Sequence, residues 1–125
     1  MMINIYAAWL GILLGIVAGA ISGLFFHEEH WLGGYGSWTR RMIRLAHISF
    51  FGLGLLNLGL ALTARAIGIS DSIGLASWLL VIGAMTMPLV CYLSAFIKPF
   101  RHLFFIPVLS VGAAVGLLVW RLFAV

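Results

Sequence analysis

Long apolar runs alternate with short polar segments along the whole chain. A helix that crosses a membrane needs about 20 mostly apolar residues, and four runs of that length are present, at about 3–26, 42–66, 73–97 and 100–123. None of them shows the ten-residue alternation of apolar and polar positions that is typical of membrane-spanning strands. The pattern therefore predicts an all-α protein.

The segments between the runs indicate how the helices are connected. The second and third links, at about 68–72 and 98–99, are very short. Short links place consecutive helices side by side in opposite directions. The sequence thus predicts an integral membrane protein with a single domain over residues 1–125, built as an up-down bundle of four transmembrane helices.

The composition agrees with lipid as the surrounding solvent. Hydrophobic residues make up 64 % of the chain and charged residues 8 %, whereas a soluble domain carries about 25 % charged residues. The mean hydropathy is +1.19. The net charge of +4 is too small and too scattered for binding nucleic acid. The first run lacks a basic leader and is too long for a cleavable signal peptide.

Basic residues predict the orientation in the membrane. The links after the first and third runs, with the residues that flank them, hold five Lys or Arg residues, and the other side holds only Arg65 and Arg121. Because basic residues favour the cytoplasmic side, we expect both termini outside the cytoplasm, in a bacterial inner membrane. The five basic residues are Arg40, Arg41, Arg44, Lys98 and Arg101.

The first run carries a glycine at every fourth position, which predicts a close contact with another helix. Small residues on one helix face let a second backbone approach, so this pattern is typical of a glycine zipper. The partner is left open: another helix of this chain, a second copy, or a foreign subunit. The helix-packing residues are Gly11, Gly15, Gly19 and Gly23, and the fourth run repeats the pattern with Gly112 and Gly116.

Two histidines are candidates for binding a cofactor. His47 lies inside the second run, where an ionisable group is costly and usually faces a partner or cavity. His102 begins the fourth run at a similar depth. Two histidines on neighbouring helices can ligate a b-type haem, and they can also contact a quinone. Alternatively, His47 hydrogen-bonds a Ser, a Thr or a backbone carbonyl, and His102 meets only solvent or lipid headgroups.

A second histidine pair follows the first run. His27 and His30 enclose two glutamates, and on a continuing helix both imidazoles share a face that can hold a divalent metal. The alternative is a polar helix end whose carboxylates pair with Arg40 or Arg41. A Ser-His-Asp set is not predicted, because the only aspartate, Asp71, lies on the opposite side from the histidines. No catalytic residues are assigned.

Three functions are compatible with these features. The first is a small, non-catalytic subunit of a respiratory or photosynthetic electron-transfer complex, packed against other integral subunits in an oligomeric assembly. The second is a structural or assembly protein without a cofactor. The third is a small standalone transporter or a lipid-handling enzyme. The absence of a carboxylate at depth disfavours an ion-coupled transporter.

Overall fold

The computed structural model describes all 125 residues and is helical throughout, without strands. The four long helices are α1 (Met2–Gly23), α2 (Trp38–Ala66), α3 (Gly74–Phe96) and α4 (Phe105–Ala124). Three short 3₁₀ segments join them: η1 (Trp31–Gly33), η2 (Ser70–Ser72) and η3 (Lys98–Phe104). All four long helical stretches are long and apolar enough to cross a membrane. The all-α class is confirmed, and the crossing of a membrane remains a prediction.

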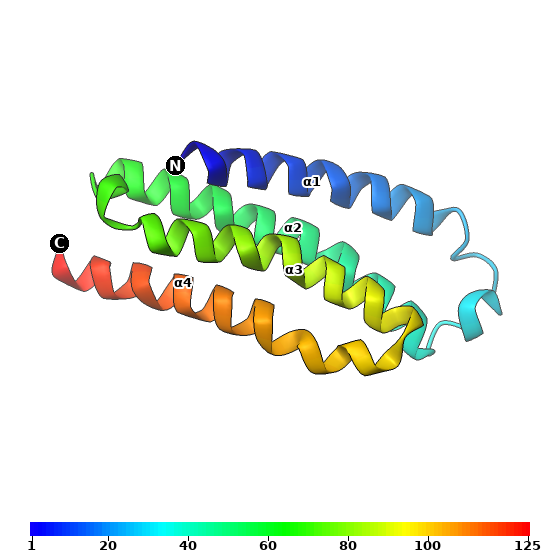
Figure 1. Cartoon of the computed structure of the whole chain (residues 1–125). Coiled ribbons are helices and arrows are strands. Elements are labelled where there is room, and N and C mark those ends of the chain that lie inside the picture. Colours follow the sequence, from blue (N-terminus) through cyan, green and yellow to red (C-terminus); the bar gives the residue numbers. More distant parts are fainter.

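The α2–α3 pair forms the centre of the molecule, with α1 along α2 and α4 along α3 (Figure 1). The chain reverses its direction from each long helix to the next (Figure 1). The inner pair is buried far more than the outer helices. Within the apolar spans, 33 % of α2 and 44 % of α3 is buried, against 11 % of α1 and of the last span. Most of the surface of α1 and α4 is therefore left without a partner in this chain.

The α2 helix begins four residues before the predicted Met42, because a capping residue precedes the apolar run. The Ser37 hydroxyl accepts a hydrogen bond from the backbone N–H of Arg40 at 3.2 Å, and it donates one to the carbonyl of Leu32 at 2.8 Å. A serine at this position satisfies an N–H group that the helix leaves unpaired. The first four residues of α2 are polar or aromatic, so hydropathy alone does not reveal them.

A glycine ends α2 and turns the chain toward α3. Gly68 adopts a positive φ of 72°, which other residues rarely accept. The N–H of Ile69 reaches the carbonyl of Ala64 at 2.9 Å, and the N–H of Gly68 reaches Arg65 at 3.4 Å. This pair of bonds is the Schellman motif that satisfies the last carbonyls of a helix.

The predicted glycine face of α1 lies against α2 of the same chain. A Cβ added at Gly11 would lie 3.3 Å from the carbonyl oxygen of Phe50, and one at Gly15 would lie 2.8 Å from the ring of Phe51. A Cβ at Gly19 would lie 2.5 Å from Nε2 of His47, whereas Gly23 has nothing within 4 Å. Three of the four glycines therefore allow the approach of α1 and α2.

The α4 helix attaches mainly through α3. The side chain of Val111 occupies the space where Gly83 lacks a Cβ. One turn further along α4, Ala114 joins a small apolar core with residues of α2, of α3 and of the link before α3. Only Pro107 and Ala114 of α4 are buried. The other members of that core are Leu60, Ala64, Ile73, Ala76 and Leu80.

Candidate functional site

The first turn of α2 ties the ends of α1 and α3 together. The indole N–H of Trp38 donates to the carbonyl of Ser94 at 2.7 Å, and the hydroxyl of Thr39 donates to the carbonyl of Ala95 at 2.8 Å. The last carbonyls of a helix have no partner within it, so these two side chains cap α3. These two bonds hold the start of α2 against the end of α3.

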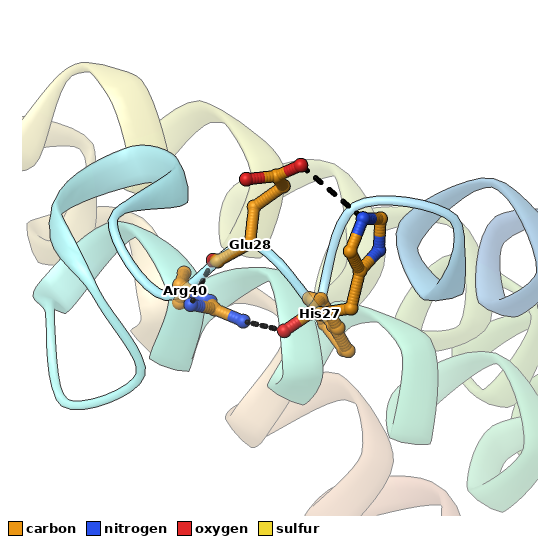
Figure 2. A network of polar contacts seen from close by, with 4 residues as sticks. His27, Glu28 and Arg40 are labelled. Carbon is orange, nitrogen blue, oxygen red and sulfur yellow. Dashed lines mark hydrogen bonds and ion pairs between the residues drawn. The ribbon is translucent and has the colours of Figure 1, made fainter.

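Arg40 holds the segment that follows α1 (Figure 2). Its side chain is almost fully buried, with a residue exposure of 2 %. The guanidinium donates to the carbonyls of Phe26 at 3.0 Å and Glu28 at 3.3 Å. It also lies 5.0 Å from the ring centre of Phe26 and 5.6 Å from that of Trp31, distances at which a cation is attracted to an aromatic face.

The carboxylate of Glu28 pairs with neither Arg40 nor Arg41, so the alternative in which it does so does not describe the structure. That carboxylate instead lies 3.2 Å from Nε2 of His27, and both side chains are exposed (Figure 2). The Nε atom of Arg40 has no hydrogen-bond partner. The charge of Arg40 is thus stabilised by backbone carbonyls and aromatic rings, and this contact is not visible in a list of acidic and basic residues.

His27 and His30 lie in turns rather than on a helix. The α1 helix ends at Gly23, and both histidines are exposed in the segment before η1. A shared face for a divalent metal required the helix to continue, and it does not. No group of three or more His, Cys, Asp or Glu side chains is close enough to hold a metal ion. The proposed metal pair therefore lacks the local structure on which it depended.

His47 lies in the space that Gly19 leaves on α1. The imidazole is half-buried, and it meets the ring of Phe51 edge-on at 5.2 Å between ring centres. None of the side-chain hydrogen bonds, from Asn4 to Arg121, involves His47. The alternative in which His47 bonds a Ser, a Thr or a carbonyl of this chain therefore does not describe the structure.

His102 occupies a different place from His47. It is exposed on η3, where it lines a small hollow with Pro99, Phe100 and Leu103. The η3 segment packs on α3, whereas His47 faces α1. None of the five main hollows of the molecule is lined by both imidazoles. The structure therefore does not bring His47 and His102 into one cavity.

A buried polar network joins α1, α2 and α3 inside the apolar spans. The amide of Asn4 donates to Oδ1 of Asn57 at 2.8 Å and to the carbonyl of Ser77 at 3.2 Å, and it accepts from the Ser77 hydroxyl. The amide of Asn57 donates to the carbonyls of Leu53 at 2.9 Å and Leu80 at 3.4 Å. Asn4 and Asn57 are fully buried. The sequence patterns did not identify Asn4 as the partner of Asn57.

A long apolar groove separates α1 from α3. It consists of two adjoining hollows of about 500 and 440 Å³ that share Leu14 and Phe50. The first begins near Tyr6, and the second ends near Trp31. The groove exists because α1 packs closely against α2 and only sparsely against α3.

The chain was compared with protein-family models, with curated proteins and with solved structures, and no match was found in any of the three.

Proposed function

We propose that the chain is a small, non-catalytic subunit of a larger electron-transfer complex, crossing the membrane four times. The observation that carries this proposal is the environment of His47. Its imidazole lies within an apolar span, is only half-buried, and has no hydrogen-bond partner in the chain. A group from outside the chain is therefore needed to satisfy it.

The cost of leaving His47 unpaired supports this reasoning. Removing a polar group from water without giving it a hydrogen bond costs about 1–3 kcal/mol of free energy, and lipid supplies no hydrogen-bond partner. Polar residues in transmembrane helices accordingly mark ligand paths or contacts with other helices. A haem, a quinone, or a polar group of a neighbouring subunit would satisfy the exposed part of this imidazole.

The orientation of His47 favours a hydrogen bond over ligation of haem iron through Nε2. That nitrogen faces the backbone of α1 at Gly19, so Nε2 reaches an external ligand only after the side chain rotates. The other ring nitrogen, Nδ1, can donate or accept a hydrogen bond without such a change. His102 lines a separate hollow, so a second haem ligand would come from another subunit.

Purification from the native membrane tests the proposal. The tagged chain is isolated in a mild detergent, its companions are identified, and haem and extracted quinone are quantified. We expect redox subunits to co-purify, and His47→Ala to alter the haem spectrum or the quinone content. His102→Ala is the matched control at the same end of the molecule. Companions without any redox subunit would contradict the proposal, and an unchanged cofactor in His47→Ala would exclude the contact at His47.

A purely structural or assembly role is the second candidate, and the open face of α4 favours it. Gly112 and Gly116 are exposed and have no neighbour within 4 Å. A glycine inside a helix costs about 1 kcal/mol relative to alanine, and an approaching helix from another subunit would offset that cost. The face has room for such a helix, because α4 buries only two residues.

Substitution on this face separates the two candidates. Gly112→Leu adds bulk on the open face, and Ala113→Leu adds bulk about 100° away around α4. Under the structural role, Gly112→Leu reduces the native mass of the complex, Ala113→Leu does not, and His47→Ala leaves electron transfer intact. A native mass that is the same in all three variants would rule out assembly through this face of α4.

A further inference from the structure

The inner part of the groove between α1 and α3 is lined by paired aromatic rings. We call this hollow of about 440 Å³ the head compartment. Four of its aromatic residues form two pairs: Phe25 and Trp31 stack at 5.3 Å between ring centres, and Phe50 and Tyr92 lie at 6.3 Å. Aromatic faces pack favourably against another planar ring.

Two hydroxyl groups belong to the same compartment. Ser22 reaches it from α1 and Tyr92 from α3. Neither hydroxyl takes part in a side-chain hydrogen bond of the chain, although Ser22 is only 9 % exposed and Tyr92 is half-buried. Each hydroxyl can donate one hydrogen bond to an acceptor such as a carbonyl oxygen. A ligand with carbonyl groups on a planar ring supplies such acceptors.

The outer part of the groove is almost entirely apolar. This hollow of about 500 Å³, the tail compartment, adjoins the head compartment at Leu14 and Phe50. Small residues such as Ala7, Gly11 and Ala84 keep it open. An extended hydrocarbon chain suits such a channel, since ligand pockets are lined mostly by hydrophobic side chains with a few placed polar groups.

We infer that this groove binds an isoprenoid quinone, with the ring between the aromatic pairs of the head compartment and the isoprenoid chain along the tail compartment. A phospholipid also carries carbonyls, in its esters, but it has no planar ring to pack against the aromatic pairs of the head compartment. His47 lines neither compartment, so this site is separate from the contact proposed for His47. The choice of a redox lipid rests on the proposed function. The fit of the ring and tail rests only on the residues that line the two compartments.

The binding experiment uses the full chain in nanodiscs free of quinone. A benzoquinone with one isoprene unit and one with eight or more units are titrated, and binding is followed by tryptophan quenching and by the amount of quinone retained after isolation. We expect saturable binding of both. The longer quinone is expected to bind more tightly, because it also fills the tail compartment.

Three substitutions locate the ligand. Tyr92→Phe removes one hydrogen bond and should raise the Kd of both quinones about five- to tenfold. That change corresponds to a hydrogen bond of about 1 kcal/mol or slightly more. Ala18→Phe fills the head compartment, which Ala18 lines, and should abolish binding of both. Ala84→Phe fills the tail compartment and should weaken only the longer quinone. Tyr6→Phe is the matched control, because Tyr6 lines the far end of the groove.

The outcomes separate this site from the proposed function. Non-saturable partitioning into the nanodisc, or equal affinity for wild type, Tyr92→Phe and Ala18→Phe with circular dichroism unchanged, would overturn the quinone site. Saturable binding with the expected pattern supports the site even if the purified complex contains no redox subunit, in which case only the proposed function fails. A redox complex whose isolated chain binds no quinone would leave the proposed function standing and refute the site.

Discussion

Replacing Asn57 by alanine should destabilise the chain strongly, because Asn57 lies at the centre of the buried network between α1, α2 and α3. Asn57→Ala removes the bond from the Asn4 amide at 2.8 Å and the bond to the Leu80 carbonyl at 3.4 Å. Hydrogen bonds between transmembrane helices contribute about 0.6 kcal/mol on average and up to about 1.7 kcal/mol. The two lost bonds therefore account for roughly 1–3 kcal/mol of the free energy of unfolding.

A second cost arises at Asn4, which keeps its position after the substitution. One of its amide N–H groups loses its acceptor in a site with 0 % exposure, and an unpaired buried donor costs about 1–3 kcal/mol. Because α1 can relax a little toward solvent or lipid, we take the lower part of both ranges. The expected loss is about 2–4 kcal/mol.

Equilibrium unfolding in mixed micelles measures this loss. The chain is titrated with a denaturing detergent, and helix content and tryptophan fluorescence are followed. Thr86→Ala is the matched control, because the Thr86 hydroxyl bonds only the carbonyl of Ile82 within its own helix; we expect a change below about 0.5 kcal/mol. The double variant Asn4→Ala with Asn57→Ala should lose less than the sum of the two single losses, since the orphaned group is gone. A loss below 0.5 kcal/mol for Asn57→Ala, or strict additivity, would refute the reasoning.

Three further substitutions test the contacts between the helices. Gly83→Leu should detach α4 from α3, because the Val111 side chain occupies the space of a Cβ. Cysteine cross-linking between α3 and α4 should then fail. Gly74→Leu should leave the cross-linking intact, because Gly74 has open space around it. Arg40→Met should accelerate amide hydrogen exchange between residues 24 and 33 by at least about tenfold, since hydrogen bonds to charged groups contribute about 1.5–3 kcal/mol; a rate like that of wild type would show that the two carbonyl contacts are dispensable. Ser37→Ala should lower the stability of α2 by about 1 kcal/mol through the lost cap, and an unchanged unfolding midpoint would contradict that role.

The apolar pattern predicted the number and approximate places of the long helices, because a membrane span requires a continuous apolar run. It also indicated the glycine face of α1, since small residues at every fourth position share one side of a helix. The start of α2 was missed because Trp38, Thr39 and Arg40 are not part of the apolar run. Their side chains bond to backbone carbonyls of α3 and of the segment after α1. Every residue has such a carbonyl, so the sequence does not show which ones act as acceptors.

The relative positions of His47 and His102 show which part of the arrangement could not be predicted from the sequence. Depth along a helix follows from counting residues, and this counting predicted that His47 and His102 lie at similar depth near the same basic end. Direction around the bundle depends on which helices touch, and that is set by contacts such as Gly19 with His47 and Gly83 with Val111. The pairing of Asn4 with Asn57 and the groove between α1 and α3 depend on the same helix placement, so they could not be read from periodicity.

The slight burial of α4 implies that the molecule opens in two stages. Native proteins release contiguous units whose opening free energies rise with their buried contacts. The network of Asn4, Asn57 and Ser77 closes without any contribution from the last helix, so we expect α1 to α3 to stay together when α4 separates. We therefore expect the last helix to separate from α3 before the network of α1, α2 and α3 opens.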